Sequence, residues 1–119
     1  MEFKRFFLNY KIGGGWVSGL GSMINPELAY YDLEKGKYLN KRFTGKFEVL
    51  NLTGNAAYLG KNLVLHIHIT LSGRDYKVFG GHLIDGKVGG TLEVFLNAVS
   101  GTKRLKKKLD SATGLTLLY

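Results

Sequence analysis

The chain has 119 residues with 17 basic and 9 acidic side chains, a formal net charge of +8 and no cysteine. This length suits a single domain over residues 1–119, and 45% hydrophobic residues suffice for a core. The lack of cysteine excludes disulfides, zinc fingers, thiol catalysis and iron–sulfur clusters. The positive charge favours contact with polyanions such as nucleic acid.

The sequence also gives no membrane signal. No apolar run reaches the roughly 18 residues of a spanning helix. The basic residues near Met1 are not followed by the apolar region and cleavage site of a signal peptide. We therefore expect a cytoplasmic protein that does not associate with membranes.

One short helix is predicted at the start of the chain. Apolar side chains at positions 3, 6, 7 and 10 follow helical spacing over Glu2 to Tyr10, and Gly13-Gly14-Gly15 ends the helix. The rest alternates between strands and turns. The expected strands are 16–21, which is followed by a tight turn, 27–33, 38–43, 47–53, 63–71, 77–84, 92–99 and 115–118. The predicted fold class is α+β, with a central, largely antiparallel sheet and one or two helices.

Three histidines form the most informative pattern. His66 and His68 lie in the strand-like run 63–71, so they point to the same face. The turn at 72–75 returns the chain so that His82 can join them, and three imidazoles suit a zinc-like ion with one open coordination position. The alternative is two strand histidines exposed to water and one at a turn. Gly80-Gly81 beside His82 indicates a bulge or a close backbone approach.

Two glutamates lie within apolar strands. Glu48 and Glu93 either face solvent or serve a metal site, as acceptors for its histidines or as the general base of a reaction. They are the candidate catalytic residues.

A basic run near the C-terminus carries the nucleic-acid hypothesis. Its cationic residues are a candidate phosphate-contacting patch, and the alternative is a solvated edge strand whose lysines oppose aggregation. The residues are Lys103, Arg104, Lys106, Lys107 and Lys108.

The order of short motifs along the chain resembles the PPC (plant and prokaryote conserved) domain. The matching segments are 17–21, 29–32, 45–55, 66–68, 78–83, 86–88, 92–94 and 109–115. The resemblance implies an α+β fold and a homotrimer. It also implies a metal site at His66, His68 and His82, because prokaryotic members share this pattern and plant members generally lack it. In plants the domain follows AT-hooks in nuclear proteins, where it serves assembly and partner binding.

The chain departs from the family pattern in two ways. It has no AT-hook, and Met1 lies almost at the first helix, where other members usually carry an additional strand. We therefore expect the usual first strand to be absent, or the start of the gene to be misplaced.

Two functions follow as hypotheses. The first is a stand-alone homotrimeric PPC protein, an assembly and regulatory module of the kind commonly named as DNA-binding, with a three-histidine metal site and weak, non-specific DNA association. The alternative is a zinc-dependent metalloenzyme of hydrolase or lyase type acting on a small substrate, with Glu93 or Glu48 as base.

Overall fold

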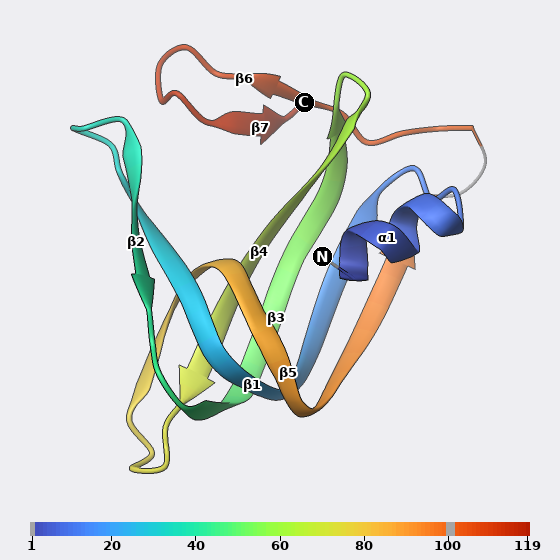
Figure 1. Cartoon of the computed structure of the whole chain (residues 1–119). Helices are drawn as coiled ribbons and strands as arrows, with labels where there is room; N and C mark the ends of the chain where they lie inside the picture. Colours follow the sequence, from blue (N-terminus) through green and yellow to red (C-terminus); the bar gives the residue numbers. More distant parts are fainter. Residues whose placement is uncertain (1, 100–101) are drawn as a thin grey trace.

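The computed structural model describes residues 2–99 and 102–119, which contain one helix and seven strands (Figure 1). Their bounds are α1 Glu2–Asn9, β1 Gly15–Asp32, β2 Lys37–Arg42, β3 Lys46–Leu59, β4 Asn62–Ser72, β5 Val78–Ala98, β6 Lys107–Leu109 and β7 Thr116–Leu118. The helix confirms the first predicted element. A second helix does not occur in the described residues. The helical part of the predicted α+β fold is therefore a single helix of eight residues.

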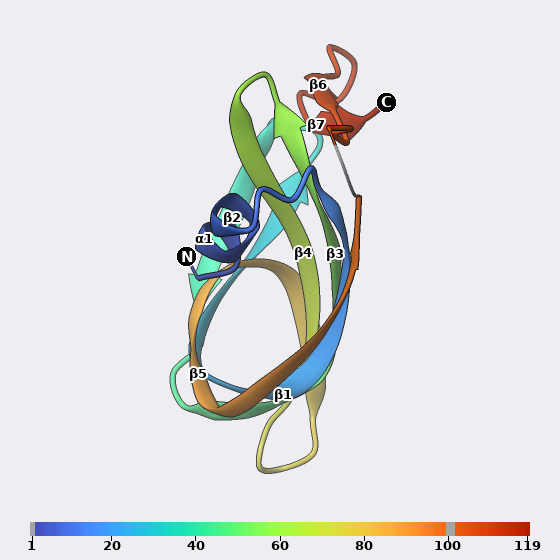
Figure 2. The same ribbon diagram turned by 90° about the vertical axis from the view of Figure 1, so that its right-hand side faces the viewer.

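Strands β1 to β5 form a largely antiparallel sheet, as predicted, in the order β2-β1-β3-β4-β5. Strand β5 also pairs with β1, so the sheet closes on itself. In Figure 2, β1 and β5 form the curved lower part of this closed sheet. The first residues of β5 pair with β4, and the rest of β5 follows β1. His82 lies at the change of partner, where it is paired with His68 of β4 and Ala29 of β1.

Strands β1 and β5 are longer than predicted. The expected turn after Gly21 is wrong, because β1 continues through it and bends where its register with β5 shifts between Ile24 and Glu27. Asn25 at this bend has a φ of 49°, and Pro26 follows without an N–H to donate. Likewise the segments predicted separately at 77–84 and 92–99 form one strand of 21 residues. In these two strands, residue types that usually end a strand lie at bends within it.

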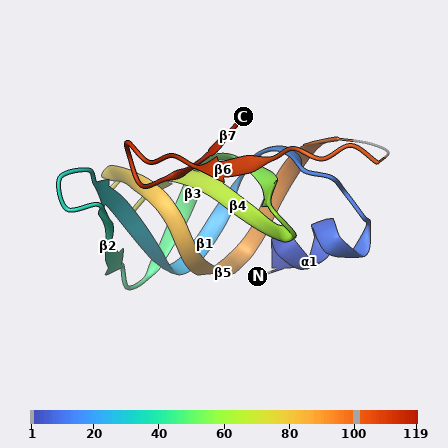
Figure 3. The same ribbon diagram turned by 90° about the horizontal axis from the view of Figure 1, so that it is seen from above.

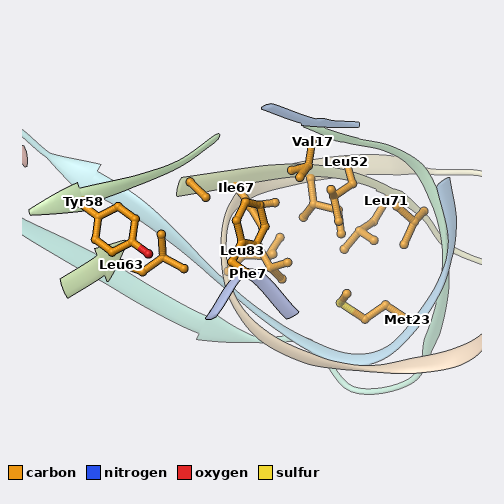
Figure 4. Packing of buried hydrophobic residues seen from close by; sticks show 13 residues of the cluster. Phe7, Val17, Met23, Leu52, Tyr58, Leu63, Ile67, Leu71 and Leu83 are labelled. Atoms are coloured by element: carbon orange, nitrogen blue, oxygen red, sulfur yellow. The ribbon is translucent and has the colours of Figure 1, made fainter. Parts of the chain in front are cut away.

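The core lies inside the curved sheet and includes one face of α1. In β4 the side chains of Leu63, Ile67, Ile69 and Leu71 are buried, while His66 and His68 alternate with them and point to the opposite face. Phe7 of α1, 1% exposed, packs into the same cluster (Figure 4). Because the apolar side chains of β4 are inside, the histidines are directed to the outer face of the sheet.

A small β6–β7 hairpin covers the outer side near the turn between β3 and β4 (Figures 1 and 3). The amide of Tyr58 donates to the carbonyl of Leu105 at 2.8 Å, and the amide of Leu105 donates to the carbonyl of Gly13 at 2.9 Å. The C-terminal segment is therefore tied to the sheet by backbone hydrogen bonds. Among the described helices, none is long and apolar enough to span a membrane.

Candidate metal and ligand site

The structure brings the three histidines together. The turn after β4 returns the chain so that His68 and His82 are directly paired, as the sequence predicted. His66, two residues earlier on β4, shares their face of the sheet. One ring nitrogen from each histidine lies within 4.8 Å of the others. The Nε2 atoms of His66 and His68 are 3.1 Å apart, and the ring centroids of His66 and His82 are 5.3 Å apart.

Two glycines allow the strands to approach closely at the histidines. A Cβ on Gly54 of β3 would lie 2.1 Å from the carbonyl oxygen of His66. A Cβ on Gly80 of β5 would lie 2.4 Å from the carbonyl oxygen of Ile69. A real Cβ atom cannot come so close to a carbonyl oxygen. Strand β4 can therefore lie this near to β3 and β5 only because these positions are glycine. The close approach predicted for Gly80-Gly81 is confirmed at Gly80.

The surroundings keep the imidazoles of His66 and His82 neutral. Burial, followed by the positive charge of Lys107 and the other two histidines, lowers the pKa of His66 to about 4. Burial, together with His68 and Lys107, also lowers the pKa of His82. A neutral imidazole has a free lone pair, which is the form that binds a metal ion.

The donor set fits a divalent ion such as zinc. Nδ1 of His82 is buried and has no hydrogen-bond partner among the residues described. Nitrogen ligands about 2 Å from a tetrahedral ion are separated by somewhat more than 3 Å. The observed separations of 3.1 Å to 4.8 Å need only a small adjustment of side chains to reach that geometry.

A cavity of about 510 Å³ opens beside the histidines. Its walls come from β1, β2, β4, the start of β5 and the C-terminal hairpin. The lining residues are Ala29, Tyr30, Tyr31, Tyr38, Val64, Leu65, His66, His68, Gly81, His82, Lys107, Leu115, Thr116 and Leu117. The site is therefore a pocket with largely apolar walls and an imidazole cluster on one side.

Tyrosines that sequence reasoning did not select form one wall of this pocket. The ring of Tyr38 stacks on His82 with centroids 4.9 Å apart, and Tyr31 contacts Tyr38 edge to face. The hydroxyl of Tyr31 donates to the carbonyl of Thr113 at 2.6 Å, which fixes the C-terminal hairpin over the site. Burial and the neighbouring Tyr31 raise the pKa of Tyr38, so its hydroxyl stays protonated. Tyr31 lies on β1, which pairs with β5, and Tyr38 lies on β2, which pairs with β1, so their approach to His82 depends on the sheet order.

Lys107 differs from both sequence-based expectations for the basic run. It is 4% exposed, so it is neither a solvated lysine nor placed on the outer surface for phosphate contact. Its side chain lines the histidine cavity, and burial lowers its pKa. The sequence carries no clear signal for this burial, since Leu109, two residues later on the same strand, is 67% exposed.

The remaining predicted residues lie elsewhere. Lys103, Arg104, Lys106 and Lys108 are exposed. The Arg104 guanidinium lies 4.3 Å from the ring centroid of Tyr58. Glu48 on β3 and Glu93 on β5 are also exposed, and neither is among the described residues that line the histidine cavity.

Comparison with known proteins places the chain in a family. A model of the Plants and Prokaryotes Conserved (PCC) domain matches residues 1–100, so the chain belongs to this family and the predicted resemblance is confirmed. No curated protein sequence matches the chain significantly.

Solved structures agree with this assignment. A plant- and prokaryote-conserved (PPC) protein from Pyrococcus horikoshii is 30% identical, with a TM-score of 0.90 over 99% of this chain and 80% of that one. A metal-containing protein from Archaeoglobus fulgidus is 32% identical, with a TM-score of 0.89 over 99% and 82%. A candidate DNA-binding protein from Bacteroides thetaiotaomicron is 25% identical, with a TM-score of 0.92 over 99% and 81%.

Proposed function

We propose that this chain is a subunit of a homotrimeric PPC protein, an assembly and binding module that holds zinc or a similar divalent ion on His66, His68 and His82. The observation that carries the proposal is the convergence of three imidazole nitrogens within 4.8 Å. The similarity to a metal-containing protein from Archaeoglobus fulgidus supports it. We further propose that it acts as a stand-alone prokaryotic protein in the cytoplasm.

Metal analysis of tag-free protein tests the metal site. We expect about one zinc ion per chain after zinc loading and dialysis, and none in the His82→Ala variant, because two remaining imidazoles hold the ion too weakly. Lys108→Met serves as the control, since Lys108 is exposed and does not line the cavity. Absence of zinc from the loaded wild-type protein would refute the metal site.

An exposed apolar patch supports assembly. Trp16 and Leu20 on β1 and Phe95 on β5 point to the same outer face and are 49%, 54% and 74% exposed. Large apolar side chains gathered on one face are typical of protein interfaces. Sedimentation equilibrium should give three times the chain mass of 13.2 kDa for the wild type and a smaller mass for Phe95→Asp. A monomeric wild type would exclude the trimer.

DNA association is proposed to be weak and electrostatic, through Lys103, Arg104, Lys106 and Lys108. These side chains are exposed, and three copies of a chain with net charge +8 carry +24. The similarity to a candidate DNA-binding protein from Bacteroides thetaiotaomicron supports this role. Binding to duplex DNA should weaken steeply between low and physiological salt, because phosphate contacts release counterions. If the protein does not bind DNA at low salt, or if binding is independent of salt, the proposed electrostatic DNA association is refuted.

The cavity favours a second candidate function, a zinc-dependent hydrolase or lyase that acts on a small substrate. A space of about 510 Å³ beside the imidazoles could admit such a molecule. A bound zinc ion would supply a water of lowered pKa. Because Glu48 and Glu93 do not line the cavity, a base would have to be another residue or a second subunit's side chain. Turnover of ester or phosphoester substrates by zinc-loaded wild type, abolished in His82→Ala, would establish this function.

A further inference from the structure

The position of Lys107 adds a second functional group to the histidine cavity. Strand β6 pairs with β7 through Lys107 and Leu118, and Lys106 bridges to Tyr58 of β3. These backbone contacts fix the strand beside the main sheet. Lys107 is consequently 4% exposed while its side chain lines the cavity together with the histidines.

Among the described residues, none supplies a counter-charge to the ammonium group of Lys107. No ion pair formed within residues 2–99 and 102–119 involves it, and no carboxylate lines the cavity in this part of the chain. A buried cation without a partner is costly, and proteins keep such groups where a ligand completes them. The three imidazoles do not help, because they carry no negative charge.

The walls of the cavity restrict the anion that it would accept. Tyr30, Tyr38 and Leu117 supply aromatic and aliphatic surface, and Lys107 is the one ammonium among the described lining residues. A phosphate dianion would need several donors to replace its hydration. A carboxylate carries a single charge, and the apolar body attached to it can contact the tyrosines.

We propose that Lys107 is the anion-binding residue of this cavity and that its ligand is a small organic carboxylate with an apolar or aromatic body. The carboxylate pairs with the ammonium group, and the body packs against Tyr38 and Leu117. This inference deepens the proposed function, since it names the ligand class of the same site. Lys107 and Leu117 lie beyond the residues matched by the family model, which ends at residue 100, and Tyr38 lies within them.

Binding of benzoate, measured by isothermal titration calorimetry on the full chain, tests the proposal. Benzamide is the neutral probe of the same shape, and inorganic phosphate is the alternative anion. Each is titrated into zinc-loaded and chelator-treated protein. We expect benzoate to bind the wild type at least about tenfold more tightly than benzamide or phosphate, because its charge-assisted hydrogen bond requires an anion.

Three variants separate charge from shape. Lys107→Met removes the charge but keeps most of the length of the side chain, and it should lose about tenfold or more in benzoate affinity while it retains zinc. Lys107→Arg keeps the charge and should retain most of the affinity. Lys4→Met, which changes an exposed lysine of α1 that does not line the cavity, should bind benzoate as the wild type does.

The outcomes distinguish this inference from the metal site. Zinc binding without benzoate binding, or an unchanged benzoate affinity in Lys107→Met, would overturn the anion site and leave the metal site intact. Benzoate binding that depends on Lys107 without any zinc would support the anion site and refute the metal. Phosphate binding more tightly than benzoate would overturn the carboxylate assignment. If Lys107→Met does not fold, equal affinities of the wild type for benzoate and benzamide would refute the proposal.

Discussion

Two cavities of this protein differ in how their charges are balanced. The second, of about 680 Å³, is larger than the histidine cavity and is lined by Phe3 of α1 and Leu83 and Leu92 of β5, among others. Its guanidinium, from Arg42, lies 2.8 Å from a carboxylate oxygen of Glu27 and 3.8 Å from one of Asp85. The chain itself therefore satisfies this guanidinium, and Lys87, the other cationic residue that lines the larger cavity, is exposed to water.

The histidine cavity has no such internal balance. Lys107 is without an ion pair in the described chain, and Nδ1 of His82 is buried there without a partner. Buried polar groups that a protein leaves unsatisfied destabilise it unless a ligand completes them. The contrast indicates that buried polar groups without partners, rather than the volume of a cavity, mark the binding site.

The largest effect should come from removing a metal ligand. His66→Ala is expected to lower zinc affinity by at least about 100-fold, since even residues that only support metal ligands cost 10–100-fold when they are replaced. Arg42→Met in the second cavity should leave zinc affinity unchanged. Competition with a chromogenic zinc chelator measures both, and equal losses in the two variants would erase the distinction between the cavities.

A glycine beside the histidines should be the next most sensitive position. Gly80→Ala would place a methyl group 2.4 Å from the Ile69 carbonyl oxygen, so β4 and β5 must separate. We expect the free energy of unfolding to fall by about 1–3 kcal/mol and zinc affinity to fall with it.

Gly90 on the same strand is the matched control for Gly80. Its added methyl would meet only the Ser22 hydroxyl oxygen, at 3.4 Å. Gly90→Ala should change stability by no more than about 0.5 kcal/mol in urea unfolding. A larger loss in Gly90→Ala than in Gly80→Ala would show that close strand approach does not build the site.

The stability of metal-free protein should depend on pH through His66. Its pKa is about 4 in the folded protein and near 6.5 when unfolded, so the unfolded state binds more protons between these values. This contribution to stability is fully present above about pH 6.5 and is lost as the pH falls toward 4. Urea midpoints in the presence of chelator should show the decline, and His66→Gln should reduce its slope. An unchanged slope would place the titration elsewhere.

The smallest effects should have opposite signs in the two cavities. Lys107→Met removes an unpaired buried cation and should raise the free energy of unfolding of ligand-free protein by up to about 1 kcal/mol. Arg42→Met breaks ion pairs on a half-exposed side chain and should lower it by about 0.2–1 kcal/mol. Thermal unfolding of the two variants checks both signs, and a destabilised Lys107→Met would mean that the chain already satisfies this lysine.

The sequence predicts the parts of this molecule that depend on local pattern. The apolar spacing at Phe3, Phe6 and Phe7 predicts α1, and the alternation around His66 and His68 predicts that both point to the same face. The turn before Val78 was sufficient to predict that His82 returns to their side.

Features that depend on the closed sheet could not be predicted in this way. A tight turn was predicted after Gly21, because local rules do not show that β5 holds β1 in register on both sides of a bend. The stacking of Tyr38 on His82 arises from strand order, and the burial of Lys107 arises from a hairpin distant in sequence. The absence of the family's usual first strand stays a prediction.

X-ray absorption spectroscopy at the zinc edge of the loaded protein tests the central claim most directly. The account predicts a first shell with three imidazole nitrogens at about 2.0–2.1 Å and one exchangeable oxygen ligand. A shell of oxygen atoms alone, without the outer-shell scattering of imidazole rings, would contradict the assignment of His66, His68 and His82 as metal ligands.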